Sequence, residues 1–283
     1  MKQKVAFQGE SGAYSEIVTM KYFPDEEIIP MKTFHDIFRD LESGEVDFAI
    51  IPIENSIEGS VNEAYDLLLR SNLGVYGEIH QRISHCLIIN QNSDSAIKSV
   101  YSHPQALAQC RRYIQQRRLE SIPTYDTAGA VRLIKDNRIM DAGAIASERA
   151  AKLYDMKIID HGIEDEKSNY TRFFVLSKKQ ISTQPTGHDA TSIIFSINHL
   201  PGALFSILAE FAKRNINLTR IESRPTKEMP WEYNFYVDIE GHSSNGSIRE
   251  ALGLIEKKTN FFRFWKKRVG MGLRRECGLF TTT

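Results

Sequence analysis

The sequence predicts an α/β protein in which two α/β lobes are followed by a smaller module with the order βαββαβ. The chain has 283 residues, which corresponds to about two domains of roughly 150 residues each. Its first two thirds alternate short apolar runs with amphipathic stretches, as strands and helices do when they take turns along a chain. A polar segment then precedes a second, compact pattern of strands and helices.

The first lobe is predicted from residues 5–68. Residues 5–7 form an apolar run that leads into Gly9 and Gly12, and apolar side chains then recur at helical spacing through Tyr22. Residues 46–53 are almost continuously apolar, which is typical of a parallel strand buried on both faces. The other elements expected in this lobe are a strand at 28–29 and helices at 34–41 and around 64–68.

The same alternation continues farther along the chain, and the middle part of the elements given below predicts a second α/β lobe. Apolar runs at 73–79 and 86–89 come first. Strands are then expected at 98–101, 119–123, 142–146, 157–160 and 172–177. The helices between them are expected at 104–117, 126–137 and 147–154.

The βαββαβ module follows a predicted linker at residues 177–189. This segment is polar, so it has few apolar side chains to bury, and Pro185 and Gly187 interrupt regular structure. The module's strands are expected at 192–197, 218–222, 233–239 and 261–264, and its helices at 202–213 and 248–255. The predicted boundaries are 1–180 for the lobes, 190–265 for the module and 266–283 for an irregular basic tail.

The composition indicates a globular protein with small-molecule partners. Its 36 Lys and Arg residues balance 36 Asp and Glu residues, so it has no general attraction for nucleic acid or for an anionic membrane. No apolar stretch approaches the roughly 18 to 20 residues that span a bilayer, and the start of the chain lacks the apolar region of a secretory signal. A cytoplasmic location is therefore expected.

The three cysteines predict neither a disulfide framework nor a metal site. Cys86, Cys110 and Cys277 are far apart, and no C-x-x-C spacing occurs. The sequence also lacks an H-E-x-x-H motif and any other tight cluster of metal ligands. We therefore expect no metal and no cofactor, and we expect the thiols to be buried or incidental.

Two segments have the layout of a ligand site, because small or polar residues follow a strand and precede a helix. In open α/β sheets ligands bind outside the carboxyl ends of the strands. The glycines of residues 9–16 allow close approach, and the helix that follows offers N–H groups to an anion. Residues 54–61 supply an amide and two hydroxyls. The structural alternatives are a tight turn for the first segment and a helix cap for the second.

Three further segments could complete such a site. Residues 102–106 place a serine and a histidine before Pro104, although this pair could simply cap a helix. Residues 144–147 on their own indicate a structural cap. Thr171 and Arg172 place a hydroxyl beside a guanidinium, and a guanidinium suits carboxylate recognition. Thr is also a common strand residue and Arg a common surface residue, so the pair could be purely structural. The predicted cleft thus suits an anionic ligand and offers no obvious strong acid or base.

Taken together, these segments resemble the prephenate dehydratase family. The matching residues, in the family's order, are Gly9, Gly12–Glu16, Glu54–Ser56, Gly59–Val61, Ser102–Ala106 and Thr171–Phe173. Residues 200–204 and 222–225 are similar to the two phenylalanine-binding motifs of that family's ACT domain. The resemblance runs from about residue 4 to residue 264. Ala13 departs from it, because many members have a hydroxyl residue at this position.

The resemblance implies a fold and a reaction. The lobes would form a type II periplasmic-binding-protein-like catalytic domain with the active site in its cleft, and the module would be an ACT regulatory domain. The enzyme, a carbon-oxygen lyase, would convert prephenate to phenylpyruvate, water and carbon dioxide in phenylalanine biosynthesis. Bifunctional members carry a chorismate mutase domain ahead of the dehydratase. Because a strand begins by residue 4 here, a monofunctional chain is expected.

The resemblance also implies the site residues. The catalytic ones are Thr171, Arg172, Asn55 and Ser56. Those that bind substrate are Ser11, Gly12, Tyr14, Gly59, Ser60, Ser102, His103, Gln105, Ala146, Ser147 and Phe173. Those that bind phenylalanine are Leu200, Pro201, Gly202, Ala203, Leu204, Asn217, Glu222, Ser223 and Arg224. The implied partners are prephenate and L-phenylalanine, which would bind where two ACT modules of a homodimer or homotetramer meet.

In our mechanistic hypothesis, Thr171 donates a hydrogen bond or a relayed proton to the departing ring hydroxyl. Arg172, Asn55, Ser56 and loop N–H groups would orient the two carboxylates. Two other functions remain open at this point. Arogenate dehydratase acts on a substrate that differs only by an amino group, and a carboxylate-sensing or solute-binding protein would bind its ligand without turnover.

Overall fold

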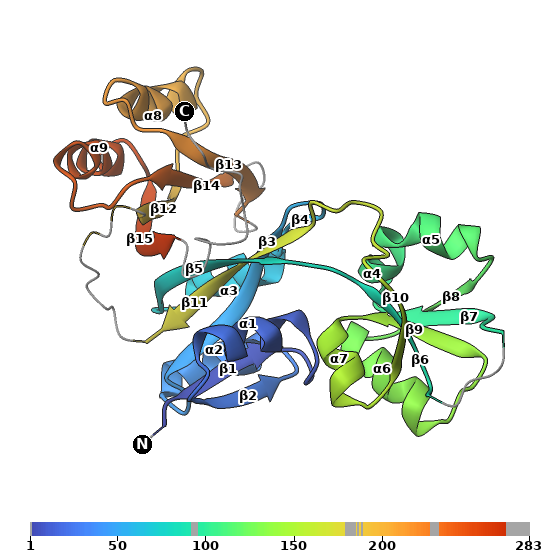
Figure 1. Ribbon diagram of the computed structural model, residues 1–283. Helices are drawn as coiled ribbons and strands as arrows, with labels where there is room; N and C mark the ends of the chain where they lie inside the picture. Colours follow the sequence, from blue (N-terminus) through green and yellow to red (C-terminus); the bar gives the residue numbers. More distant parts are fainter. Residues whose placement is uncertain are drawn as a thin grey trace. The chain divides into compact units, whose positions relative to one another are not determined.

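The chain divides into two compact units (Figure 1). The computed structural model describes residues 2–91, 96–178, 189–226 and 232–269, together with Pro185 and Gly187. The first unit holds the described residues up to Lys178 apart from Gly74–Glu78, and the second holds Gly74–Glu78 and the described residues beyond Lys178. The predicted fold class, two α/β lobes followed by a βαββαβ module, is confirmed.

The first lobe has three parallel strands, to which two antiparallel strands are added. Its strands are β1 (Lys4–Gln8), β2 (Glu27–Met31), β3 (Phe48–Asn55), β4 (Gly59–Ser60) and β11 (Tyr170–Ser177), and its helices are α1 (Tyr14–Tyr22), α2 (Phe34–Ser43) and α3 (Asn62–Arg70). Strand β1 pairs in parallel with both β2 and β3, and β11 pairs antiparallel with β3. Residues 5–7 of β1, and residues 49–51 and Ile53 of β3, are buried, as the apolar runs predict.

Helix α2 shows how local sequence sets these elements. Its N-cap is Thr33, whose Oγ1 accepts a hydrogen bond of 3.1 Å from the backbone N–H of Asp36. It ends at Gly44, which has a φ of 89° that an L side chain rarely adopts. Between these ends, the helix buries Phe34, Ile37, Phe38 and Leu41 on one face.

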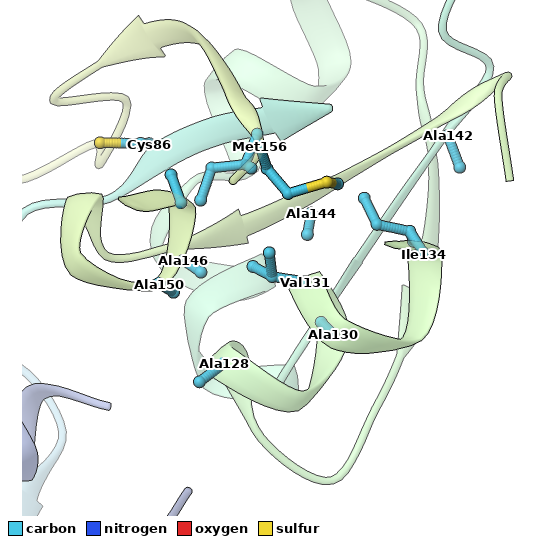
Figure 2. Close-up of a cluster of buried hydrophobic side chains, with 12 residues drawn as sticks. Cys86, Ala128, Ala130, Val131, Ile134, Ala142, Ala144, Ala146, Ala150 and Met156 are labelled. Atoms are coloured by element: carbon cyan, nitrogen blue, oxygen red, sulfur yellow. The ribbon is translucent and has the colours of Figure 1, made fainter. Parts of the chain in front are cut away.

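The second lobe has a mixed five-stranded sheet. Its strands are β6 (Cys86–Ile89), β7 (Ser99–Ser102), β8 (Glu120–Pro123), β9 (Ala142–Ala146) and β10 (Lys157–His161), in the spatial order β10-β6-β9-β7-β8. Its helices are α4 (Pro104–Gln109), α5 (Arg111–Gln116), α6 (Thr127–Asp136) and α7 (Glu148–Leu153). Figure 2 shows the core on one face of this sheet, where alanines of α6, α7 and β9 surround Val131 and Ile134. Small side chains let these helices approach the sheet closely.

The structure breaks the single helix expected at 104–117. Cys110, with φ −111° and ψ 22°, separates α4 from α5. Its side chain is fully buried in an apolar cluster with Leu107 and Ile114. No glycine or proline marks this break, so helical periodicity could not reveal it.

Two segments connect the lobes, and they run side by side. Strand β5 (Gly74–Arg82) continues into one, residues 83–85, and residues 162–169 form the other. The N–H of Ile83 donates to the carbonyl of Asn169 (2.8 Å), and the N–H of Ile163 donates to the carbonyl of His85 (3.1 Å). The buried carboxylate of Glu164 accepts the N–H of His85 at 2.9 Å. We call these two segments the hinge.

The second unit has the predicted βαββαβ order. Its elements are β12 (Asp189–Ser196), α8 (Ala203–Ala212), β13 (Leu218–Pro225), β14 (Tyr233–Glu240), α9 (Gly246–Glu256) and β15 (Phe261–Val269). The antiparallel strands lie in the order β13-β14-β12-β15. Apolar side chains of β12 and β14 pack against α8 and α9, with Phe195 and Phe211 fully buried.

The structure corrects the start of the predicted tail. Strand β15 continues to Val269, and Arg268 and Val269 pair in parallel with Gly77 and Glu78 of β5. Residues 266–269 are therefore part of the sheet, which explains why Gly74–Glu78 groups with the second unit. The rest of the tail, Cys277 and parts of the predicted linker lie outside the described residues. Within the described ranges, no helix is long and apolar enough to cross a membrane.

Candidate active site

The centre of the candidate site is a pair of side chains, Asn55 and Thr171. Asn55 is the last residue of β3, and Thr171 lies directly opposite it near the start of β11. Directly opposed residues of antiparallel strands share one face of the sheet. The Asn55 amide is buried, whereas Thr171 is partly exposed. This register brings together two of the four residues expected to be catalytic.

The orientation of the Asn55 amide is fixed by backbone donors. Its Oδ1 accepts the N–H groups of Ile57 (3.0 Å) and Glu58 (3.1 Å), which can only donate. The amide nitrogen Nδ2 therefore points the other way and donates to Thr171 Oγ1 at 3.0 Å. Because Oγ1 accepts this bond, the Thr171 hydroxyl keeps its own hydrogen to donate to a ligand.

The Asn55 amide also bonds to two residues at the start of the strand that holds Thr171. Nδ2 is 2.8 Å from Asn169 Oδ1 and 3.2 Å from the carbonyl of Tyr170. Asn169 in turn donates through Nδ2 to Gln109 Oε1, at 2.9 Å. Gln109 lies at the end of α4 in the second lobe, so this chain of buried amides links the two lobes.

Sequence reasoning did not select Asn169, Gln109 or His85, and all three are buried in this network. His85 Nε2 is 3.0 Å from the Oε1 that Asn169 already contacts on Gln109. Asn169 lies two positions before Thr171 in the sequence and could have been selected with it. Gln109 lies on a helix face that periodicity predicts to be apolar. A polar side chain on such a face is the one feature of the sequence that could have indicated Gln109 as a functional residue.

Tyr14 reaches the hinge with its hydroxyl. It donates to the carbonyl of Ser84 at 2.6 Å and lies 3.1 Å from His85 Nδ1. The two rings meet edge to face, with centroids 5.6 Å apart. Burial raises the pKa of the Tyr14 phenol well above its usual value. Tyr14, expected to bind substrate, thus uses its hydroxyl within the protein.

Two N–H groups just before α1, in the segment that the sequence suggested for an anion, bond within the protein. The N–H of Gly12 donates to Glu16 Oε2 at 2.9 Å, and Arg149 also contacts this carboxylate at 3.1 Å. The N–H of Ala13 donates to the carbonyl of Glu10. The protein's own carboxylate thus accepts one of the N–H groups that the motif suggested for a ligand. Ser11 beside it is partly exposed.

Gly12 and Ser147 form a close contact between the lobes. Ser147 Oγ donates to the carbonyl of Gly12 at 2.6 Å and accepts the N–H of Ala150 at 3.1 Å, so it also caps α7. A Cβ built on Gly12 would lie 3.0 Å from the Cα of Ala150, and the φ of Gly12 is 97°. Both residues, expected to bind substrate, hold the lobes in contact here.

Replacing Gly12 with Ala is expected to lower the free energy of unfolding by about 2 to 4 kcal/mol, because backbone strain and overpacking add. Gly44→Ala is the matched control, since Gly44 has a similar φ of 89° and open space around its Cβ position. That change is expected to cost about 1 kcal/mol. Urea denaturation of both variants measures the difference, and equal losses would contradict the close approach.

Arg172 does not share the face of Thr171. It pairs across the strands with Glu54, so its side chain leaves β11 on the opposite face from Thr171. Arg172 Nη2 lies 3.2 Å from Glu54 Oε2 and 3.2 Å from the Tyr65 hydroxyl, and the side chain is 14% exposed. This placement departs from the expectation that Arg172 and Asn55 grip one ligand. Arg172 thus contacts the carboxylate of Glu54, whereas the sequence suggested that it would contact a carboxylate of the substrate.

The loop after β3 is tied to β11. Ser56 Oγ donates to the carbonyl of Ser168 (3.1 Å) and accepts the N–H of Tyr170 (2.9 Å). The loop returns as the short strand β4, which contains Gly59 and Ser60. Gly59 has a φ of 80° and open space around it. Ser56 thus holds the loop in place, and Gly59 permits its turn.

The residues expected from 102–106 and 144–147 lie around β7 and β9 of the second lobe. Ser102 is fully buried and donates to the carbonyl of Ile145 at 2.6 Å. His103 caps α4, with Nδ1 accepting the N–H of Gln105 at 3.3 Å. The Ala146 side chain belongs to the apolar core in Figure 2. Ser102 and Ala146 therefore have structural roles here, and the buried ring of Phe173 does too.

In the second unit, three of the residues expected to bind phenylalanine line one small cavity. It has a volume of about 130 Å³, and Leu200, Ala203 and Leu204 contribute to its wall. Pro201 and Gly202 form the turn before α8, where Gly202 has a φ of 81° and nothing within 4 Å of its Cβ position. This turn requires glycine for its backbone angle rather than for space.

The other four expected residues are not among those that line this cavity. Glu222, Ser223 and Arg224 lie on β13, where Glu222 pairs with Arg220 and Arg224 lies over the ring of Tyr236. Asn217, just before β13, donates to Glu240 at 3.0 Å. A single module therefore presents the two motifs at separate places.

The buried thiols are not poised as nucleophiles. Cys86 Sγ lies 3.5 Å from His161 Nδ1, but burial raises the pKa of Cys86 to about 11. Burial also raises the pKa of Cys110. Among the described residues, no group of three or more His, Cys, Asp or Glu side chains could hold a metal ion.

Two family models match this chain, one over the two lobes and the other over most of the βαββαβ module. Residues 5–181 match the model described as prephenate dehydratase, and residues 191–253 match the ACT domain. A curated relative from Arabidopsis thaliana, arogenate dehydratase/prephenate dehydratase 2, is 41% identical over 270 residues. The match covers 92% of this chain and 71% of the relative.

Two solved structures are similar over almost the whole chain. Prephenate dehydratase from Arthrobacter aurescens in complex with L-Phe has a TM-score of 0.86 at 29% identity, covering 94% of this chain and 89% of the other. A protein described as GqqA, a quorum-quenching acylase, also has a TM-score of 0.86 at 29% identity, covering 95% and 99%. Because the first family model spans more than half of the residues and the plant relative is similar along most of its length, this chain belongs to the prephenate dehydratase family.

Proposed function

We propose that this chain converts prephenate to phenylpyruvate, carbon dioxide and water. The observation that carries the proposal is the Asn55–Thr171 pair, in which the threonine hydroxyl accepts a hydrogen bond from a fixed amide and keeps its own hydrogen for a ligand. Family membership supports the same reaction. The departing ring hydroxyl is the group that needs such a donor.

The reaction needs little acid or base strength from the protein. The electron pair of the bond between the ring and its carboxylate moves into the ring as carbon dioxide leaves. The bond to the ring hydroxyl then breaks with uptake of one proton, which gives water and an aromatic ring. The gain in aromaticity drives the reaction, so the enzyme's task is to orient the substrate and stabilise the leaving oxygen. Thr171, too weak an acid to protonate it directly near pH 7, offers it a hydrogen bond or relays a proton to it.

The direct test offers prephenate and arogenate separately to the purified chain and quantifies phenylpyruvate and phenylalanine. Phenylpyruvate formed from prephenate supports the proposal. Phenylalanine formed from arogenate alone would assign the second candidate substrate, since the name of the Arabidopsis relative includes both activities. Binding of either compound without product would indicate a sensing protein. An N-acylated amine in a parallel assay tests the activity named for the similar acylase structure.

We also propose that L-phenylalanine inhibits this enzyme through its ACT domain. The cavity beside α8 supports this, because Leu200, Ala203 and Leu204 give it an apolar wall suited to a phenyl ring. The L-Phe complex of the Arthrobacter protein supports it as well. Inhibition requires that the ligand favour a less active state, with a coupling of about 1–3 kcal/mol.

Added L-phenylalanine is expected to lower turnover, and Ala203→Leu is expected to raise the half-inhibitory concentration at least about tenfold, because the larger side chain fills a cavity of about 130 Å³. Ala212→Leu, at the exposed end of α8, is the matched control. Steady-state assays over a range of phenylalanine concentrations measure both. If phenylalanine leaves the wild-type rate unchanged at every concentration, the regulatory proposal fails.

We further propose that the enzyme forms a homodimer or homotetramer and acts in the cytoplasm. Large apolar side chains are exposed on the second unit, with Leu200 at 66% and Phe205 at 75%. Such side chains are often covered by a partner. Light scattering after size-exclusion chromatography gives the assembly, and cell fractionation gives the location.

A further inference from the structure

The first turn of α1 presents several hydrogen-bond donors on one side. Within the described ranges, the N–H groups of Tyr14, Ser15 and Glu16 have no hydrogen-bond acceptor, and the N-cap residue Ala13 supplies none. The hydroxyl of Ser15 has no partner in these ranges either, although the residue is only 6% exposed. Because the Cα–Cβ bonds of a helix tilt toward its N-terminus, this hydroxyl points to the side of the N–H groups. Such a group of donors favours an anion.

Arg149, which belongs to none of the sequence motifs, places a positive charge beside this turn. Its Nε lies 3.1 Å from Glu16 Oε2, the oxygen that also accepts the N–H of Gly12 at 2.9 Å. Neither Nη group of Arg149 donates a hydrogen bond within the part of the chain that the structure describes. The side chain is 35% exposed, so a small molecule can reach it. Glu16 therefore holds a guanidinium whose remaining donors can bind a carboxylate.

The start of α1 lies where the two lobes and the hinge meet. Gly12 contacts Ser147 of the second lobe, and the Tyr14 hydroxyl reaches the hinge. The turn follows β1, which runs parallel to its neighbour β3, so both strands end at the same edge of the sheet. Asn55 is the last residue of β3. The donors of α1 and the Asn55–Thr171 pair therefore lie at the edge where open α/β sheets bind their ligands.

We propose that Arg149, Ser15 and the first turn of α1 bind the side-chain carboxylate of prephenate or arogenate. This inference rests on the proposed function. Both candidate substrates carry one carboxylate on the ring and one on the side chain. The ring carboxylate loses its charge as carbon dioxide leaves, so a cation that held it would stabilise the substrate more than the transition state. The side-chain carboxylate keeps its charge, and its side chain is attached to the ring carbon opposite the hydroxyl that Thr171 is proposed to contact.

Arg149→Gln is expected to raise KM at least about tenfold and to change kcat less than about threefold. The reason is that a carboxylate which keeps its charge is bound equally in the ground state and the transition state. Ser15→Ala is expected to raise KM about threefold to tenfold, as for the net loss of one hydrogen bond. Steady-state assays with the substrate that the wild-type protein converts measure both variants.

Arg132→Gln is the matched control for the contact between the lobes. Arg132 also joins a helix of the second lobe to a carboxylate of the first, at 2.9 Å from Glu10, and its loss should leave KM unchanged. If Arg132→Gln raised KM as much as Arg149→Gln does, these ion pairs would only hold the lobes together, and the inference would be overturned.

A second control separates contact with the substrate from neutralisation of Glu16. Without the guanidinium of Arg149, the Glu16 carboxylate would repel an anionic substrate. A double variant that combines Arg149→Gln with Glu16→Gln removes both charges. Its KM should stay at least about tenfold above that of the wild type, because the contact with the substrate is still missing. A KM near the wild-type value would overturn the inference.

Binding of the product gives a readout without turnover. Phenylpyruvate retains the side-chain carboxylate but has neither the ring carboxylate nor the ring hydroxyl. Isothermal titration should show its Kd raised in Arg149→Gln by about the same factor as KM, and thermal unfolding checks that each variant is folded. If Arg149→Gln does not fold, Ser15→Ala takes its place in the titration. An unchanged Kd would overturn the assignment of this carboxylate. If the wild-type protein converted neither prephenate nor arogenate, the proposed function would fail, and the titration would still test Arg149.

Discussion

Thr171→Ala is expected to lower kcat for prephenate by about 10² or more, the usual loss when one transition-state donor is removed. The hydroxyl of Thr171 accepts a hydrogen bond from the Asn55 amide at 3.0 Å. In the proposed mechanism, its own hydrogen is donated to the substrate. The side chain is partly exposed, so its truncation should leave folding intact. Steady-state kinetics and thermal unfolding measure the two effects.

Two further substitutions of Thr171 give the controls. Thr171→Ser keeps the hydroxyl and should stay within about tenfold of wild-type kcat, whereas Thr171→Val keeps the shape and should be as poor as Ala. Near-normal turnover in the Val variant would remove Thr171 from the mechanism. A Ser variant as inactive as Ala would show that the methyl group matters more than the hydroxyl.

Asn55→Asp is expected to lower kcat by about 10² to 10³, because it reverses the hydrogen bond that orients Thr171. The new carboxylate keeps the acceptor for the N–H groups of Ile57 and Glu58 but loses the donor at Nδ2. Its second oxygen would face Thr171 Oγ1, so the threonine hydrogen would turn toward this carboxylate and away from the substrate. Asn169 Oδ1, 2.8 Å from the present nitrogen, would face an oxygen as well.

The same substitution should cost stability, by about 1–3 kcal/mol in the free energy of unfolding, since it leaves a buried polar group without a donor. Asn72→Asp adds an equal charge at an exposed position and is the control for both measurements. Urea denaturation and steady-state assays report the two effects separately. A variant with wild-type kcat would show that the orientation of Asn55 does not determine the donor at Thr171.

The fold could be read from the sequence because each element carries a local signal. The apolar run 46–53 and the apolar periodicity of 34–41 predicted β3 and α2 to within about two residues at each end. The break at Cys110 and the extension of β15 to Val269 were not predicted. Both depend on what packs against the segment, through the burial of Cys110 and the pairing of β15 with β5.

The site was predictable only in part, because the motifs name residues without saying which groups their side chains contact. Asn55 and Thr171 are 116 positions apart, and strand register brings them together. The same register places Arg172 opposite Glu54, on the other face of the strand. Gln109 and His85 belong to no motif that a single sequence reveals, and they become visible only when buried polar groups are traced from donor to acceptor.

The pairing of β15 with β5 bears on how this protein can be shortened. A chain that ends at Lys178 keeps every residue of the prephenate dehydratase match except the last three, yet it lacks the strand that pairs with Gly77 and Glu78. The exposed backbone groups of β5 would then offer an edge to other molecules, and such edges promote aggregation. The catalytic half on its own is therefore expected to associate and to lose solubility, although its motifs are all present.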